Sequence, residues 1–280
     1  MTLRRLLSFL SAIALILLIW GYATALRDPA VRRARIGLAD WPGGAAPVRA
    51  LVLSDIHVAG PDMPPERLSR IVRQINALRP DLVLIAGDFV NDRPVSTRIY
   101  STEQSIAPLA GLRPRLRTVA VLGNHDHWRK DKEVAAALRA AGILVLDNDA
   151  AAIGPLSVGG LDDAFTEHDD LKRTMARMRA LPGARILLSH SPDPFAKLPT
   201  DIGLMASGHT HCGQISLPLI GPVSTYSDYG NRYACGLIRE QGKVLVVGAG
   251  IGASILPLRL GAPPDMWLLE LGPVRSGGAR

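Results

Sequence analysis

Five short polar motifs, each directly after a short apolar run, constrain the fold of this chain more than any other feature. The apolar runs predict buried strands over residues 48–54, 82–86, 118–122, 185–189 and 203–207. Apolar residues at helical spacing predict helices over residues 64–78, 102–110, 133–141 and 169–180. Further strands are predicted over residues 143–146, 150–160, 233–238, 244–247 and 266–271. This alternation of strands and helices, with strands at the end, predicts an α/β domain with a mixed sheet.

The polar motifs consist of residue types that bind first-row divalent metals. They are Asp55-Ile56-His57, Gly87-Asp88, Gly123-Asn124-His125-Asp126, His190 and Gly208-His209-Thr210-His211. Five of the seven histidines lie in them, and imidazole with carboxylate suits Mn, Fe, Zn or Co. Ligands bind at the carboxyl ends of strands in open α/β sheets, so these side chains are expected to converge. The motifs predict two metal ions about 3.5–4 Å apart, a pair that promotes in-line phosphoryl displacement.

The candidate metal ligands are Asp55, His57, Asp88, Asn124, His190, His209 and His211. In an extended Asp-x-His segment the two side chains point to one side, so Asp55 and His57 are expected to bind one ion. His209 and His211 have the same spacing, but on a sharp turn they would reach two different ions. The spacing alone leaves both arrangements open.

The order of these motifs resembles that of the calcineurin-like metallophosphoesterases, over residues 48–271. The resemblance implies a four-layer αββα sandwich, here with an N-terminal apolar helix. It also implies that Asp88 bridges the two ions. The first ion would be held by Asp55, His57, Asp88 and His211, and the second by Asp88, Asn124, His190 and His209. The catalytic residues implied are His125, which would stabilise the transition state or protonate the leaving group, and Asp126, which would orient His125.

Within that family, the chain is similar to a membrane-associated bacterial branch. The similarity lies in the runs Gly208 to Gln214 and Gly248 to Gly252, in the pair Arg259-Leu260 and in the apolar N-terminal segment. It implies a hydrolase that attacks a phosphodiester or pyrophosphate with a metal-bridging hydroxide, with Mn as the expected metal. The expected substrate is lipid-linked, such as UDP-2,3-diacylglucosamine of lipid A synthesis. The alternatives are a phosphodiesterase for soluble nucleotides or nucleic acid, and a non-catalytic membrane-tethered binding module.

The beginning of the chain predicts contact with a membrane. Arg4 and Arg5 precede an uncharged apolar run from Leu6 to Leu26, which is long enough to span a bilayer. A retained anchor in the bacterial inner membrane and a cleaved signal peptide both fit this pattern, and the side that holds the catalytic domain stays open. The predicted organisation is an anchor or signal segment over residues 1–35, a linker over 36–47 and a metallophosphoesterase domain over 48–280.

The net charge limits the kinds of binding partner that are expected, and the cysteine count bears on disulfide formation. The net charge of +7 suits a phosphorylated substrate or an acidic membrane surface. The basic residues are scattered and match no nucleic-acid-binding motif, so no nucleic acid is expected as a partner, and no protein partner is evident. Cys212 and Cys235 are expected to be free, because two cysteines do not make a disulfide scaffold.

Overall fold

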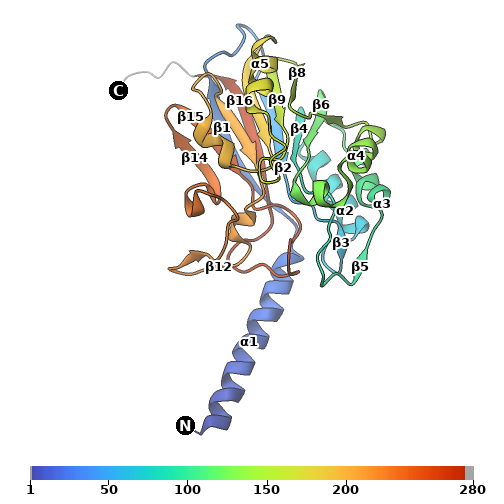
Figure 1. The fold of residues 1–280 in the computed structure, drawn as a ribbon, viewed down its shortest axis with the longest axis vertical. Helices are drawn as coiled ribbons and strands as arrows, with labels where there is room; N and C mark the ends of the chain where they lie inside the picture. The colour runs from blue at the N-terminus through green and yellow to red at the C-terminus, as the bar shows by residue number, and fades with distance from the viewer. Residues whose placement is uncertain (1, 275–280) are drawn as a thin grey trace.

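The fold of residues 2–274 is described by a computed structural model. It consists of one long helix, α1 (Leu3–Ala25), and a domain built on two packed six-stranded sheets (Figure 1). Most of α1 projects away from the domain, and its side chains up to Trp20 are exposed. Only its last turns touch the domain, where Gly21, Thr24 and Ala25 are buried.

The first sheet contains three adjacent parallel strands whose carboxyl ends meet at one edge, β2, β4 and β6. Its full order is β1 (Ala30–Leu38), β16 (Asp265–Pro273), β2 (Val48–Leu53), β4 (Leu82–Ala86), β6 (Arg117–Val121) and β7 (Leu144–Val145). β16 is antiparallel to β2 and parallel to β1.

The second sheet also has a parallel centre, formed by β9, β10, β11 and β15. Its order is β14 (Gly236–Glu240), β15 (Lys243–Val247), β11 (Leu204–Ser207), β10 (Ala184–Ser189), β9 (Leu156–Leu161) and β8 (Asp149–Ile153). The outer strands β14 and β8 are antiparallel to their neighbours. Two small ribbons pair β3 (Ala59–Gly60) with β5 (Arg98–Ile99) and β12 (Ser216–Leu217) with β13 (Gly221–Pro222).

Helices cover the outer faces of both sheets, which confirms the predicted four-layer α/β sandwich. One apolar core lies between the first sheet and the helices α2 (Pro65–Ala77), α3 (Thr102–Ile106) and α4 (Asn124–Ala140). A second core fills the space between the sheets, and a third lies beneath α5 (Leu171–Arg179). Each fully buried aliphatic side chain stabilises such a core by about 1.5–3 kcal/mol. Four 3₁₀ turns complete the fold: η1 (Ala107–Gly111), η2 (Asp193–Lys197), η3 (His211–Gly213) and η4 (Gly230–Tyr233).

Two parts of the structure differ from the sequence-based expectation. Residues 30–38 form β1, although residues 1–35 were predicted to be an anchor or signal segment and residues 36–47 a linker. Pairing with β16, more than 200 residues away in the sequence, stabilises this strand. The local sequence therefore does not predict it. The helix predicted over residues 133–141 is the second part of α4, which is kinked at Lys130. The first part begins at Asn124, so the Asn-His-Asp motif lies in the first turn of α4.

Candidate metal centre

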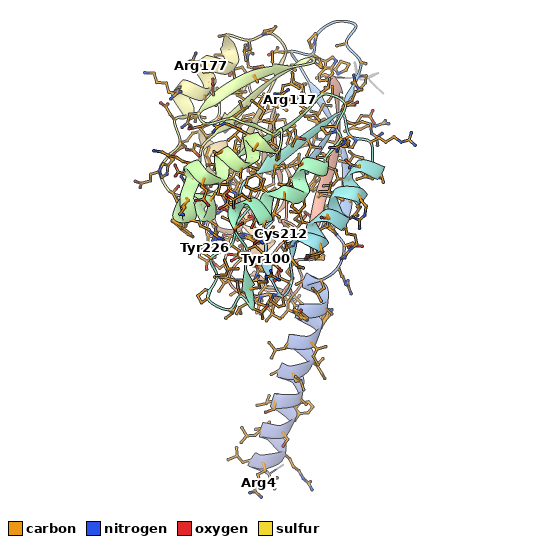
Figure 2. All side chains as sticks on the ribbon, turned by 90° about the vertical axis from the view of Figure 1, so that its right-hand side faces the viewer. Arg4, Tyr100, Arg117, Arg177, Cys212 and Tyr226 are labelled. Atoms are coloured by element: carbon orange, nitrogen blue, oxygen red, sulfur yellow. A yellow bond between two sulfur atoms is a disulfide. The ribbon has the colours of Figure 1, made fainter. Side chains whose placement is uncertain are left out.

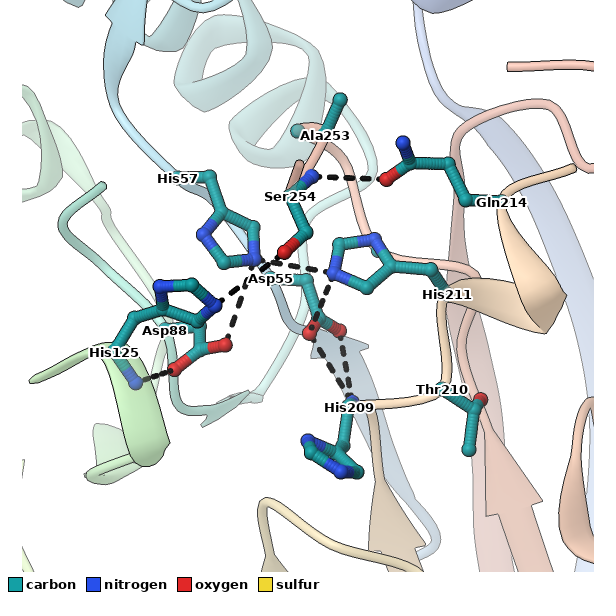
Figure 3. A network of polar contacts seen from close by, with 12 residues as sticks. Asp55, His57, Asp88, His125, His209, Thr210, His211, Gln214, Ala253 and Ser254 are labelled. Carbon is teal, nitrogen blue, oxygen red and sulfur yellow. Dashed lines mark hydrogen bonds and ion pairs between the residues drawn. The ribbon is translucent and has the colours of Figure 1, made fainter. Parts of the chain in front are cut away.

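The seven predicted ligands converge where β2, β4, β6, β10 and β11 end. Figure 3 shows five of them, Asp55, His57, Asp88, His209 and His211. Asp88 lies at the centre of the group. Its Oδ2 atom is 3.4 Å from Nε2 of His57 and 3.2 Å from Nε2 of His190. All three side chains are almost completely buried. One carboxylate oxygen therefore faces two histidines that come from different sheets.

A first group of donor atoms lies on the His57 side of Asp88. The Nε2 atoms of His57 and His211 are 3.1 Å apart, and Nε2 of His211 is 3.4 Å from Oδ1 of Asp55. The donor atoms of these three residues all lie within 4.8 Å of one another, the spacing expected of ligands to one cation. The carboxylate of Asp55 also accepts the backbone N–H of His209, which ties the two motif loops together.

A second group lies on the His190 side. Oδ1 of Asn124 is 3.0 Å from Nε2 of His190 and 3.0 Å from Nδ1 of His209, and the two ring nitrogens are 3.2 Å apart. His209 and His211 therefore point to different sides of Asp88. Of the two arrangements that their spacing left open, the structure shows the one with a sharp turn.

Backbone carbonyls determine which ring nitrogens carry protons in this second group. Nδ1–H of His190 donates to the carbonyl of Ala86 at 2.7 Å, and Nε2–H of His209 donates to the carbonyl of Tyr226 at 3.0 Å. The remaining nitrogen of His209 thus turns a lone pair toward Oδ1 of Asn124, which is also an acceptor. Burial would lower the pKa of His190, but Asp88 raises it well above its usual value, so Nε2 of His190 carries a proton that points into the group. A cation that replaces this proton would be bound by the two ring nitrogens and by Oδ1 of Asn124. This donor set therefore fits a divalent metal.

The charge states also suit metal binding. Burial lowers the pKa of both His57 and His209 to about 3, so each imidazole is neutral at pH 7. Burial would raise the pKa of Asp88, but the attraction of His190 and His125 holds it well below its usual range. Burial raises the pKa of Asp55 to about 6. Neutral imidazoles and ionised carboxylates are the forms that coordinate metals, so His57 and His209 are ready to bind an ion, whereas His190 must first lose its proton.

The backbone is strained at these residues. Asp55, His57, Asp88, His209 and His211 all have left-handed φ angles, between 48° and 68°. Each such residue costs about 1–2 kcal/mol relative to an ordinary conformation, so the surrounding fold must offset the strain. Strained backbone concentrated at one polar cluster is typical of a functional site.

Close packing of the motif loops explains one of the glycines. A Cβ atom on Gly208 would lie 2.3 Å from Oδ2 of Asp55 and 2.3 Å from Oγ of Ser54. Real Cβ atoms essentially never approach this closely, so only glycine lets β11 end against β2. Gly208 thus brings the His209–His211 turn to the Asp55 carboxylate.

His125 lies at the edge of the cluster, beside the cavity. Its Nδ1 atom is 2.6 Å from Oδ1 of Asp92, and its Nε2 atom is 3.3 Å from Oγ of Ser254. Burial would lower the pKa of His125, but Asp88 and Asp92 raise it above its usual value. His125 is therefore in a position to carry a proton next to the metal centre.

The orienting role predicted for Asp126 is wrong. Its carboxylate accepts backbone N–H groups of Gly123, Asp88, Phe89 and Val90, at 2.9–3.3 Å, and does not contact the His125 ring. Asp126 thus shapes the loop that carries Asp88. Asp92, which the sequence analysis did not select, is the carboxylate that holds His125, because the loop after β4 folds back toward the first turn of α4.

Arg259 is a second residue that was missed. It is fully buried and lies 3.1 Å, through Nη2, from Nδ1 of His211. The same guanidinium donates to the carbonyls of Ala249, Gly252 and Ala262. It therefore joins the last loop of the domain to a candidate ligand. The pair Arg259-Leu260 is part of the resemblance to the membrane-associated branch, but the sequence does not predict that Arg259 contacts His211.

The centre opens into a cavity of about 320 Å³. Polar residues of the site form one end, including Asp88, His125 and His211. The remaining wall is mainly apolar and contains Trp128, Phe165, Ile215, Val223, Ile255 and Leu256. The ring of Phe165 packs 4.6 Å from that of His209. The cavity therefore combines a polar reaction centre with an apolar binding wall.

The expectation that both cysteines are free is also wrong. Cys212, directly after His211, forms a disulfide with Cys235, and their Cα atoms are 4.7 Å apart. The bond ties η3, which contains a candidate ligand, to the segment before β14. Folding brings together two cysteines 23 residues apart, which the sequence alone does not show.

Comparisons with known proteins agree with this geometry. Residues 48–213 match the family described as calcineurin-like phosphoesterase. The chain is 31% identical over 239 residues to the uncharacterized metallophosphoesterase YkuE of Bacillus subtilis, covering 82% of this chain and 81% of that one. It is 32% identical over 245 residues to phosphodiesterase YaeI of Escherichia coli, covering 84% and 86%. It is 31% identical over 273 residues to a transmembrane protein with metallophosphoesterase domain of Danio rerio, covering 91% of this chain but only 60% of that protein.

Proposed function

This chain belongs to the calcineurin-like phosphoesterase family, and on that premise we propose that it hydrolyses a phosphodiester or pyrophosphate bond with two divalent metal ions. The observation that carries the proposal is the position of Asp88 between two groups of donor atoms. One oxygen that faces His57 on one side and His190 on the other is suited to bridge two ions. A relative named as a phosphodiesterase supports the reaction class.

The metals would be held by the residues of the two donor groups. The first group is Asp55, His57, Asp88 and His211, and the second is Asp88, Asn124, His190 and His209. When bound, divalent ions supply Lewis acidity and lower the pKa of water to near neutrality. Imidazole and carboxylate donors suit Mn, Fe, Zn and Co alike. We propose Mn for the first tests.

The protein's own contribution to the reaction centres on His125. Asp88 and Asp92 raise its pKa, so the ring can be cationic near neutral pH. Its Nε2 faces the cavity side, near Ser254, while Nδ1 is held by Asp92. A cationic imidazole there stabilises negative charge that develops on phosphate oxygens and donates a proton to the leaving oxygen. The Asp92 carboxylate balances the positive charge of His125 and fixes the orientation of the His125 ring.

The substrate that we propose is a lipid-linked phosphodiester or pyrophosphate. The apolar wall of the cavity would bind an acyl or prenyl chain, and α1, which is long and apolar enough to cross a membrane, would keep the enzyme near its substrate. UDP-2,3-diacylglucosamine is one such molecule. Soluble nucleotides are the second candidate, because a phosphoester without a lipid chain needs only the polar residues that line the cavity. A non-catalytic binding module is disfavoured because all seven donor residues are present.

We place the catalytic domain on an oxidising side of the membrane. Disulfides persist in exported domains and are rare in the cytosol, and Cys212 is bonded to Cys235. Two of the four arginines that closely follow α1 take part in ion pairs of the domain. Arg32 pairs with Asp265 and Arg35 with Glu270, so these residues serve the folded domain.

The test is hydrolysis of bis-p-nitrophenyl phosphate by the full chain in detergent, with Mn²⁺ added or removed by chelation. We expect activity that requires the metal and falls at least about 10³-fold in Asp88→Asn and about 10²-fold in His125→Ala. Arg177→Ala, an exposed change far from the site, is the matched control. Metal analysis of the wild type should give two ions per chain. A folded protein that binds one ion or none, and cleaves no diester, would overturn the proposal.

A further inference from the structure

An exposed apolar surface lies at the end of the domain from which α1 projects. At the tip of the β12–β13 hairpin, Leu219 is 108% exposed and Ile220 71% exposed, and Val223 follows at 63%. Ile255, on the neighbouring loop, is 52% exposed. Leu217 and Leu256 complete this group, which we call the tip surface. Exposed apolar side chains that gather in this way mark an interaction site.

The segments that carry the tip surface contain no charge. Residues 214–226 and 248–258 have no Asp, Glu, Lys or Arg, in a chain in which 20% of residues are charged. A protein partner at an ordinary interface meets a polar rim around its apolar centre, and these two segments contribute no charge to such a rim. The composition is instead that of a segment in contact with lipid.

Hydrogen bonds fix the tip surface relative to α1. The backbone N–H of Arg259 donates to the carbonyl of Gly21 at 2.9 Å. The next residue, Leu260, pairs with the base of the hairpin, since its carbonyl accepts from Ser216 at 2.8 Å and its N–H donates to Gln214 at 3.0 Å. The hairpin, the loop and the last turns of α1 therefore form one connected unit. Figure 1 shows β12 beside the point where α1 enters the domain.

The cavity opens at the same end. Val223, Ile255 and Leu256 belong to the tip surface and also line the cavity that contains Asp88. Figure 2 places Cys212 and Tyr226 at the α1 end of the domain, whereas Arg177 lies at the opposite end. An apolar path thus runs from the mouth of the cavity toward the metal centre.

We propose that the tip surface inserts into the membrane that α1 crosses, so that the cavity opens directly onto the lipid headgroups. The hairpin side chains would enter to the headgroup–acyl boundary, about 5–10 Å deep. A lipid-linked phosphoester would then reach the metal centre while its chains stay along the apolar wall. The inference deepens the proposed function and rests on it for the reaction, but the insertion itself is independent of catalysis.

The test measures how deep residue 219 lies in the bilayer. The full chain carrying Leu219→Trp is reconstituted into phosphatidylcholine–phosphatidylglycerol vesicles, with and without bromine on the acyl chains, and the wild-type signal is subtracted. We expect brominated lipid to remove at least about half of the added fluorescence, and acrylamide in the water to remove little. Arg177→Trp is the control, and its signal should show the reverse pattern.

Each outcome is decisive. Quenching of the added fluorescence in Leu219→Trp by acrylamide and not by brominated lipid would overturn the insertion. Protection from both quenchers, with a doubled mass in detergent by light scattering, would show instead that the tip surface binds a second copy of the chain. Leu219 does not line the cavity, so Leu219→Trp should retain wild-type hydrolysis of bis-p-nitrophenyl phosphate. Absence of that activity in the wild type would count against the proposed function and leave the depth result unaffected.

Discussion

Replacing Gly252 with alanine tests how precisely the last loop of the domain positions the metal centre. Gly252 lies in the uncharged run after β15, and its N–H donates to the carbonyl of Asp55 at 2.8 Å. A Cβ atom at this position would lie 2.0 Å from the carbonyl oxygen of Ile56, whereas real Cβ atoms essentially never come closer than 3.0 Å. One of the two backbones must therefore move by about 1 Å.

The displacement falls on the candidate ligands, because Ile56 is the residue between Asp55 and His57. A misplacement of about 1 Å at a reaction centre costs about 10²-fold in rate, which corresponds to about 2.7 kcal/mol of transition-state stabilisation. Overpacking of this kind lowers the free energy of unfolding by about 1–3 kcal/mol. We therefore expect Gly252→Ala to remain folded, with a lower melting temperature and kcat/KM reduced about 100-fold.

The assay is hydrolysis of bis-p-nitrophenyl phosphate at saturating Mn²⁺, with thermal unfolding measured on the same samples. Gly248→Ala is the matched control from the same run. Its Cβ would meet nothing closer than 3.5 Å, so its rate should stay within about twofold of wild type. Wild-type kcat/KM and melting temperature in Gly252→Ala would refute the argument, since they would mean that the loop yields without moving the ligands.

Three further predictions follow from the site. Asp92→Asn should lower the pKa of His125, so the alkaline limb of the kcat–pH profile moves to lower pH and kcat falls about 10–100-fold. A limb at the wild-type pH would show that Asp92 does not raise the pKa of His125. The Kd for Mn²⁺, measured by calorimetry, should rise about fivefold from pH 6 to pH 5 and approach tenfold per pH unit below that, because Asp55, with a pKa of about 6, must lose its proton to bind. A constant Kd from pH 6 to 5 would contradict this. Cys235→Ser should lower the free energy of unfolding by about 3 kcal/mol through the lost constraint on the unfolded chain, and an unchanged denaturant midpoint would contradict it.

The sequence by itself determined the inner strands, the helices beside them and the residues of the metal centre. The runs that became β2, β4 and β10 are short and apolar, and each is followed directly by a motif of ligand type. The physical reason is local. A strand buried on both faces needs a continuous apolar run, and polar side chains are tolerated only where that strand ends. The pattern along the chain therefore predicts both where these strands lie and which polar residues follow them.

Only the tertiary structure decided what depends on contacts between distant segments. β1 exists because β16 pairs with it, and the disulfide exists because folding brings Cys212 and Cys235 together. Asp92 holds His125, and Arg259 reaches His211, through loops that pack side by side without any shared sequence pattern. Each of these interactions joins residues that are distant in the sequence. Three-dimensional packing decides which residues meet, so the sequence shows no periodicity or spacing that would predict the pairs.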